Sequence, residues 1–393
     1  MKGFLNKYYQ RKIISLPQNK SLLLSWHYVN TTDPSPAPEV QTASWPSPSA
    51  CSPLPVAGSP TPSASCLLPV AGWSLPAAGS PTSSACWPLP SAGRRRLAIL
   101  VDKRGWAYHD KALEKSRFLG DKWQTEIFFL EDKPEIDPAK FDLLYNYNHT
   151  PSKYDELFHG RLIKGLYSHY YLGSFIPWRY IYNMVKHASV LVVANREQAE
   201  EIRPFFRNTE VLPDGVDTRQ FYMEKERTGE TIVAGWSGNP DRRLNGRGVK
   251  RFYEVVEPAC KAAGVELRAG QDLSRDELRR MYNDVDVVLI ASVTEGNPLC
   301  LFEAGACGRT VIATRTGVVP EIIEDGVNGF IIDHPLSDNE VLRQMTLRLE
   351  WCREHPSEMR KMGLLLRDKI LSMRTSEITG AIFKSMLDNM YRL

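Results

Sequence analysis

The stretch from Val287 to Asp333 constrains the fold more than any other part of the sequence. It begins with an all-apolar run, VVLIA, of the kind that a strand buried on both faces of a parallel sheet needs. A loop, an apolar helical segment that ends at Gly308 and a β-branched strand from Thr310 to Ala313 follow. Strands that alternate with helices in this way predict an α/β fold with parallel sheets covered by helices.

Two carboxylates mark the loop and helix inside this stretch. Glu295 lies in the loop and Glu303 in the helix, with seven residues between them. We expect Asn297 to cap the helix and Pro298 to occupy its first turn. A helix N-terminus at the carboxyl ends of parallel strands favours anionic groups. The pattern therefore predicts a site for an anionic ligand.

The same stretch resembles a known enzyme family. Its pattern is E-G-x-P-x(4)-E-A-x-A-C-G, then a strand, then G-x-x-P-E-I-I-x-D-G-x-N-G-F. This is similar to the donor-binding half of retaining glycosyltransferases of family 4 (glycosyl transferases group 1). These enzymes have two Rossmann-like domains facing across a cleft, the GT-B fold. Many members have Phe-Gly where this chain has Asn297-Pro298, which leaves the donor sugar open.

The resemblance assigns roles to residues of this stretch. It implies that Glu303 binds the donor ribose and that Glu295 lies on the sugar side as a catalytic residue. It also implies donor contacts from the residues that follow Glu295, which are Gly296, Asn297, Pro298 and Leu299.

A loop rich in glycine and arginine follows the apolar strand at 231–236. Its sequence is SGNPDRRLNGRG, and we expect a helix from about Val249 to Ala263 after it. Glycine lets the backbone approach a diphosphate, and guanidinium groups bind phosphate oxygens through paired hydrogen bonds. The family has an arginine and a Lys-Gly pair near this helix start, and the lysine position falls on Asn245 or Arg247. We therefore expect donor-binding residues among Gly238, Arg242, Arg243 and Arg247, with a solvated helix start as the alternative for the basic side chains.

A later helix start has a clear local signal. The sequence Ser274-Arg275-Asp276-Glu277 has a capping-box pattern, which predicts a helix that begins there.

The N-terminal half carries weaker signals. A buried strand at 97–102 leads into a loop with one glycine, Gly105, and without a G-x-G-x-x-G motif. Further strands are expected at 125–130, 141–145, 166–168, 190–194 and 210–212. The resemblance implies that Gly105 faces the cleft, and a tight turn without a ligand is the alternative. It also implies a histidine that contacts the transferred sugar. His169 is the first candidate for this catalytic role and His149 the second, although a histidine in a polar loop is often only structural.

Composition and pattern divide the chain into five parts. Residues 1–35 have no assignable role, and residues 36–93 form a Pro/Ser/Ala-rich linker that we expect to be disordered because it cannot bury a core. A Rossmann-like acceptor domain is expected at 94–222 and a donor-binding domain at 223–375. The resemblance implies that a last helix, 376–393, crosses back to the first domain. Between the domains, Pro213-Asp214-Gly215-Val216-Asp217 resembles the family's P-N-G-V-D turn, with Asp214 in place of asparagine.

The bulk properties exclude few partners. A formal net charge of +3 and a pI of about 8.4 do not require nucleic acid. Seven cysteines without a C-x-x-C motif or zinc spacing are typical of free thiols in a reducing compartment. There is no apolar run as long as a membrane span and no signal-peptide core, so we expect a cytoplasmic protein, with peripheral membrane association left open.

These observations predict a hexosyl- or related glycosyltransferase that uses a nucleotide-diphosphate sugar, with retention and without a metal or other cofactor. Asp284 and Asp286 have the D-x-D spelling of a metal site, but they lie at the entry to a buried strand. The alternatives are a catalytically silent nucleotide-sugar-binding or assembly subunit and a GT-B epimerase. The donor base and the acceptor, which could be a glycan, lipid-linked glycan, small metabolite, protein or nucleic acid, stay open.

Overall fold

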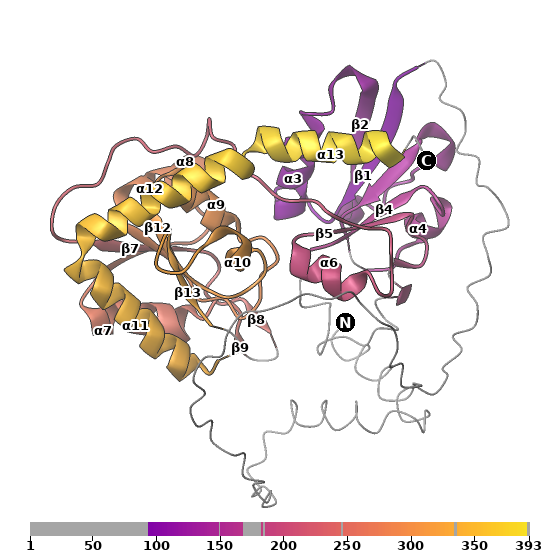
Figure 1. Cartoon of the computed structure of the whole chain (residues 1–393). Helices are drawn as coiled ribbons and strands as arrows, with labels where there is room; N and C mark the ends of the chain where they lie inside the picture. Colours follow the sequence, from indigo (N-terminus) through magenta and orange to yellow (C-terminus); the bar gives the residue numbers. More distant parts are fainter. Residues whose placement is uncertain are drawn as a thin grey trace, which may run out of the picture. The chain divides into compact units, whose positions relative to one another are not determined.

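The structure is a computed structural model, and it describes residues 93–148, 150–167, 182–183, 185–244, 247–333 and 336–390. Within these residues the chain forms two parallel β-sheets with helices packed on them (Figure 1). The α/β fold class predicted from alternating strands and helices is therefore confirmed. No helix in the described ranges is long and apolar enough to cross a membrane.

In the described part of the chain, the N-terminal sheet has six parallel strands in the order β2-β1-β3-β4-β5-β6. They are β1 (Arg95–Val101), β2 (Trp123–Phe129), β3 (Leu143–Asn146), β4 (Leu162–Leu166), β5 (Val190–Val193) and β6 (Thr209–Val211). The connecting helices are α3 (Ala107–Ser116), α4 (Lys153–Leu157) and α6 (Arg196–Ile202), with 3₁₀ turns at Gly120–Lys122, Leu130–Asp132 and Pro138–Lys140. Successive side chains of β1 enter different cores, Leu97 and Ile99 one cluster and Ala98 another, so both faces of the sheet are buried.

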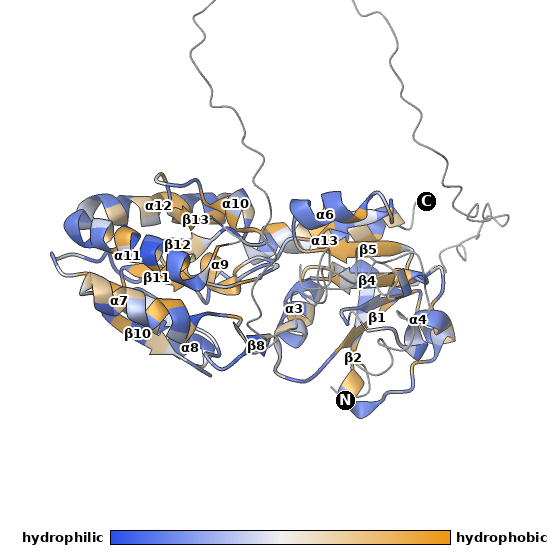
Figure 2. Ribbon diagram, turned by 90° about the horizontal axis from the view of Figure 1, so that it is seen from below, coloured by the Kyte–Doolittle hydropathy of each residue, from blue (hydrophilic) through white to orange (hydrophobic). Residues whose placement is uncertain are grey.

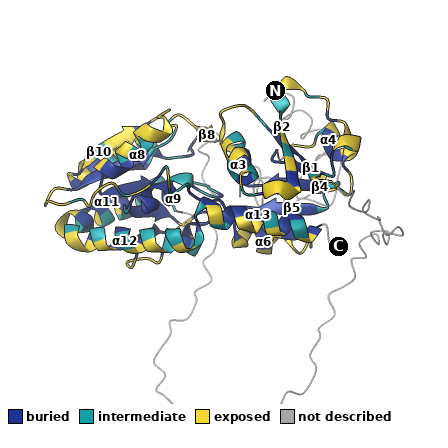
Figure 3. Cartoon of the chain, turned by 90° about the horizontal axis from the view of Figure 1, so that it is seen from above, coloured by how far each residue is buried: buried dark blue, intermediate teal, exposed yellow. Residues whose placement is uncertain are grey.

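Between Val233 and Ile332 the structure describes a second sheet, with five parallel strands in the order β10-β7-β11-β12-β13. They are β7 (Val233–Ser237), β10 (Glu266–Gly270), β11 (Val287–Ile290), β12 (Thr310–Thr314) and β13 (Phe330–Ile332). Its helices are α7 (Glu257–Ala263), α8 (Arg275–Asp284), α9 (Leu299–Ala306), α10 (Val319–Ile322), α11 (Asp338–Glu354) and α12 (Pro356–Met373). Apolar strands such as β5 are orange in Figure 2, and Figure 3 shows buried central strands in dark blue beside yellow, exposed residues along α12.

The last helix of the described chain, α13 (Ser376–Met390), packs on α3 of the N-terminal sheet. The segment before it pairs with the turn that follows β6: the Val216 amide donates to the Arg374 carbonyl at 2.8 Å, and the Ser376 amide donates to the Val216 carbonyl at 3.0 Å. Further along α13, the Phe383 ring lies 5.6 Å from the Tyr145 ring in the N-terminal core. Helix α13 therefore packs against the core of the N-terminal sheet.

The expected helix from Val249 to Ala263 is wrong in its first half. A small antiparallel pair, β8 (Arg243–Leu244) and β9 (Arg247–Gly248), comes first, then a π-helical turn at Phe252–Val256, and only then α7. Arg251 has φ of 50°, which no right-handed helix accepts. Pro258, in the first turn of α7, lacks an amide hydrogen, so the helix register is interrupted there.

The fourth strand also differs from its prediction. The sequence favoured a strand at 166–168, whereas β4 is Leu162–Leu166. Lys164 lies in the middle of β4, so the sequence of this strand lacks the continuous apolar run that predicts a buried strand. The structure buries this lysine and pairs it with Asp155 at 2.7 Å, so a charged residue occupies a buried strand position.

Candidate active site

Glu295 lies between β11 and α9 and forms an ion pair with Lys250. Its Oε1 also accepts a hydrogen bond from the Ser292 hydroxyl at 2.7 Å. Burial raises the pKa of Glu295, whereas the charge and the hydrogen bond of Lys250 lower it by more. The pKa of Glu295 therefore lies below its ordinary value. Burial lowers the pKa of Lys250, and the attraction of Glu295 overcomes this and raises it. Both groups are therefore charged at neutral pH.

Lys250 is a candidate site residue that the sequence did not indicate. The resemblance placed the family's lysine at Asn245 or Arg247, and Lys250 is the basic residue that pairs with Glu295 in the structure. The residue after it, Arg251, adopts a left-handed conformation with φ of 50°, which glycine adopts most easily. A glycine would adopt the backbone conformation of Arg251 readily, so a Lys-Gly pair would also suit this turn, and the arginine concealed that possibility in the sequence.

Arg251 anchors this segment from inside the protein. Its side chain is fully buried, pairs with Asp338 at 2.8 Å and donates to the Ala291 carbonyl at 3.4 Å. Ala291 directly follows β11, so the guanidinium connects the Lys250 segment to the strand that precedes Glu295. The position of Lys250 thus depends on the end of β11, which also leads into the loop that carries its partner Glu295.

Glu303 is buried on α9 and accepts from Arg275 at 2.7 Å and from the Tyr282 hydroxyl at 3.4 Å. Burial raises the pKa of Glu303, and the charge of Arg275 only partly offsets this. Arg275 is the first residue of α8, whose predicted capping box is present: the Ser274 side chain accepts from the Glu277 amide, and the Glu277 carboxylate accepts from the Ser274 amide. The sequence signal for this helix start was therefore correct.

The remaining predicted donor residues lie in the loop after β7. Gly238 has φ of 152°, and a Cβ there would lie 3.3 Å from the Trp236 ring. Arg242 is exposed and lies near enough to contribute to lowering the pKa of Glu295. Arg243 pairs with Glu254 at 3.4 Å. The side chain of Arg247 lies outside the described residues.

Gly105, His149 and His169 were the predicted residues of the N-terminal half. Gly105 has φ of 69° in the turn before α3, and its amide donates to His109 Nδ1 at 3.0 Å. This conformation is the tight turn that a glycine permits. His149 and His169 lie outside the described residues.

The capping role predicted for Asn297 is wrong. Pro298 is the N-cap residue of α9 without a side-chain cap, and Leu299 is the first helical residue. The Asn297 amide group instead donates to Asp214 Oδ2 at 3.0 Å. Asparagine is a strong capping residue in isolation, but here a buried carboxylate from a distant segment takes its amide.

Gly296 lies against the end of β4. A Cβ on this glycine would be 1.8 Å from the Tyr167 carbonyl oxygen, so only glycine fits. The Gly296 carbonyl accepts from the Val318 amide at 3.0 Å and from Asn195 Nδ2 at 3.4 Å. The loop from Glu295 to Pro298 is therefore fixed by both sheets.

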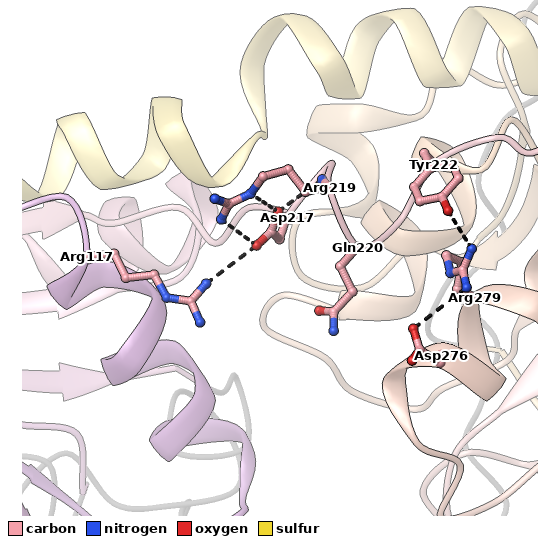
Figure 4. A pocket seen from close by; sticks show the side chains of 7 residues that line it. All are labelled: Arg117, Asp217, Arg219, Gln220, Tyr222, Asp276 and Arg279. Carbon is pink, nitrogen blue, oxygen red and sulfur yellow. Dashed lines mark hydrogen bonds and ion pairs between the residues drawn. The ribbon is translucent and has the colours of Figure 1, made fainter.

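A pocket of about 360 Å³ adjoins this site without containing its carboxylates (Figure 4). It is lined by Arg117, Asp217, Arg219, Gln220, Tyr222, Asp276 and Arg279. Arg219 and Arg117 both pair with Asp217, at 2.8 and 3.5 Å, so a single carboxylate offsets part of the charge of two guanidinium groups. Gln220 connects the pocket to Glu303, because its Oε1 accepts from Arg275 at 3.2 Å.

The donor-side geometry agrees with a family match. Residues 256–363 match the family of glycosyl transferases group 1. Among curated proteins, the chain is 41% identical over 202 residues to D-inositol 3-phosphate glycosyltransferase of Corynebacterium jeikeium, covering 39% of this chain and 48% of that protein. It is 28% identical over 105 residues to lipopolysaccharide 1,2-N-acetylglucosaminetransferase of Salmonella typhimurium, covering 26% and 28%. The chain spans less than half the length of these curated relatives.

Solved structures share the fold over most of the described chain. Sucrose-phosphate synthase from Thermosynechococcus elongatus is 11% identical with a TM-score of 0.58, covering 76% of this chain and 100% of that one. Anabaena HepE, solved in complex with UDP and glucose, is 15% identical with a TM-score of 0.56, covering 75% and 100%. These likenesses confirm the two-sheet GT-B fold that the sequence predicted.

Proposed function

We propose that the protein is a retaining glycosyltransferase of family 4 that transfers a sugar from a nucleotide-diphosphate sugar. The observation that carries this proposal is the arrangement of Glu295 and Glu303 at the start of α9. Glu303 is buried and Glu295 is partly buried, and each pairs with a basic residue: Lys250, which follows β9, pairs with Glu295, and Arg275, the first residue of α8, pairs with Glu303. A nucleotide-diphosphate sugar offers hydroxyl groups that carboxylates bind and phosphates that basic residues bind.

Glu303 binds the ribose in this proposal. A carboxylate accepts up to four hydrogen bonds, and Arg275 and Tyr282 supply two, of which the second is long. Two acceptor positions therefore stay available for the neighbouring hydroxyls of a ribose. Burial at this position strengthens such bonds because water competes less for the carboxylate.

Lys250 and Arg242 meet the diphosphate. When the bond between sugar and diphosphate breaks, negative charge develops on the leaving group, and preorganised positive groups stabilise it. The first amides of α9 have no partner inside the helix and add a partial positive charge at the same end. Because the chain's own groups supply this charge, we propose a reaction without a metal ion.

Glu295 serves the sugar side. Its ionised carboxylate stabilises the positive charge that develops on the sugar ring as the leaving group departs. A bound diphosphate offers Lys250 a second anionic partner, so donor binding shares the lysine between phosphate and Glu295. The intact set of ionised groups, and the transferase names of the curated relatives, support turnover over a silent binding subunit or an epimerase.

We infer a cytoplasmic location from the cysteines. The four in the described part, Cys260, Cys300, Cys307 and Cys352, are free thiols, which suits a reducing compartment. Burial raises the pKa of each to about 12, so they stay protonated and unreactive.

Donor binding tests the proposal. Thermal unfolding of the protein is followed with UDP, GDP and ADP and their common sugar conjugates, starting with UDP because HepE was solved with it. One nucleotide should raise the melting temperature of the wild type and of Glu266→Ala, an exposed control on β10, but not that of Glu303→Ala. If no nucleotide stabilises the wild type, the donor assignment is wrong.

A further inference from the structure

Asp214 is a buried carboxylate that joins three parts of the molecule. It follows β6, and its side chain is 2% exposed. Two lysines from successive turns of α3 pair with it: Lys111 contacts Oδ2, and Lys115 contacts Oδ1 at 3.3 Å. Asn297 of the donor loop donates to Oδ2 at 3.0 Å. One carboxylate thus connects α3, the turn after β6 and the loop before α9.

Asp214 is ionised in this environment. Burial raises its pKa, but the charges of Lys111 and Lys115, with hydrogen bonds from Lys111 and Asn297, lower it well below the usual range. The two lysines contact both oxygens of the carboxylate and hold it in place. A charged acceptor then holds the Asn297 amide more strongly than a neutral one could.

Two neighbouring contacts support the same loop. Tyr167 follows β4, and its carbonyl lies against Gly296; Asn195 follows β5, and its side chain donates to the Gly296 carbonyl. With Asp214 after β6, three adjacent strands of the N-terminal sheet each place a residue from their carboxyl ends on two consecutive loop positions. The loop that follows β11 is therefore positioned by the other sheet.

The chain departs from the family pattern at both ends of this contact. Asp214 stands where the resembling turn has asparagine, and Asn297 stands where many members have phenylalanine. The two departures are directly hydrogen-bonded to each other. Besides its ion pairs with Lys111 and Lys115, the carboxylate at 214 is therefore the acceptor for the amide at 297.

We propose that Asp214 is a positioning residue that acts through Asn297 to set the loop from Glu295 to Pro298 for sugar transfer. This inference rests on the proposed function in one respect, that the loop contacts the donor sugar. Nucleotide binding depends on Lys250 and Glu303, which Asp214 does not touch. Loss of the contact therefore reduces turnover more than nucleotide affinity.

The experiment uses full-length Asn297→Asp, Asp214→Asn and the double variant that exchanges the two residues. Asn297→Asp sets two carboxylates against each other and should lower kcat about tenfold or more, because misplaced reacting groups lose rate steeply. The affinity for the bound nucleotide should stay within about threefold, since the ribose and phosphate contacts remain. The exchanged pair restores an amide next to a carboxylate. Because Lys111 and Asn297 contact the same oxygen of Asp214, a carboxylate at 297 still lies near Lys111, and the exchanged pair should recover part of the lost kcat.

A second measurement, made without ligand, tests the position of the loop directly. Amide hydrogen exchange of a peptide spanning 293–301 should rise in both single variants and return toward the wild-type rate in the exchanged pair. Glu210→Gln is the matched control: it removes an exposed carboxylate from β6, the strand that leads into the same turn. It should change neither exchange nor kcat.

The outcomes separate the two proposals. If the wild type binds no nucleotide, the proposed function fails, while the exchange data still decide whether Asp214 positions the loop. Unchanged exchange in Asn297→Asp, or equal losses of kcat, nucleotide affinity and melting temperature without recovery in the exchanged pair, would show that Asp214 is merely structural.

Discussion

Lys250 and Glu295 form an ion pair although 45 residues separate them in the chain. The lysine comes from the segment after β9 and the glutamate from the loop after β11, so the pair forms only when the second sheet is assembled. It gives the loop before α9 one fixed positive and one fixed negative group side by side. In the proposed function, the positive group contacts the diphosphate and the negative group faces the sugar.

Replacing the lysine tests this pair. Lys250→Met should reduce kcat/KM by about a hundredfold, as the loss of one transition-state charge contact does in other enzymes. Lys261→Met, an exposed lysine on α7, is the control and should leave kcat/KM unchanged. Steady-state kinetics of both variants measure these effects. An equal kcat/KM for Lys250→Met and the wild type would show that Lys250 does not take part in the reaction.

Gly296 is predicted to tolerate no side chain. Gly296→Ala would set a methyl group 1.8 Å from the Tyr167 carbonyl, and neither backbone segment can move freely. We expect a loss of about 1–3 kcal/mol in the free energy of unfolding, typical of overpacking, together with a tenfold or larger loss of kcat. Urea denaturation measures the first effect. Gly93→Ala, where the added methyl group meets open space, should cost nothing.

The raised pKa of Glu303 predicts a pH dependence of stability. Because burial favours its protonated form, the folded state binds this proton more tightly than the unfolded state. The resulting stabilisation is present below the ordinary glutamate pKa and is lost as pH rises through the folded-state pKa. Glu303→Gln lacks this term, so its melting temperature relative to the wild type should increase between about pH 4.5 and neutrality. A difference that is constant with pH would contradict the assignment.

The buried pair of Lys164 and Asp155 should matter for stability alone. Asp155→Ala leaves a buried ammonium without its counter-charge, at a cost of about 3–5 kcal/mol in the free energy of unfolding. Nucleotide affinity of the folded fraction should not change, because the pair lies in the N-terminal sheet away from α9. Chemical denaturation and equilibrium binding on the same variant test the two statements separately.

The sequence predicted the second sheet well because its strands are apolar runs between clear helix signals. β11 and β12 were placed to within a residue, and the capping box at Ser274 marked α8 correctly. Such signals are local, since burial on both faces demands continuous apolar residues and a helix start demands a cap. These signals can therefore be recognised in a short stretch of sequence, without the residues that contact it in the fold.

The errors arose where a distant contact decides the local structure. Lys164 is tolerated inside β4 only because Asp155 reaches it. Arg251 accepts a left-handed conformation because Asp338 and the end of β11 hold its side chain, and this concealed Lys250. Asn297 reads as a helix cap, but Asp214, 83 residues earlier, takes its amide. Neighbouring sequence contains none of these partners.

The most direct test of the account is consumption of a nucleotide sugar. Purified protein is incubated with UDP-, GDP- and ADP-sugars and a mixed panel of acceptors, and the released nucleoside diphosphate is measured. The account predicts saturable release from one donor by the wild type, lost in Glu303→Ala and strongly reduced in Lys250→Met. Release that is equal in the wild type and in Glu303→Ala would contradict it.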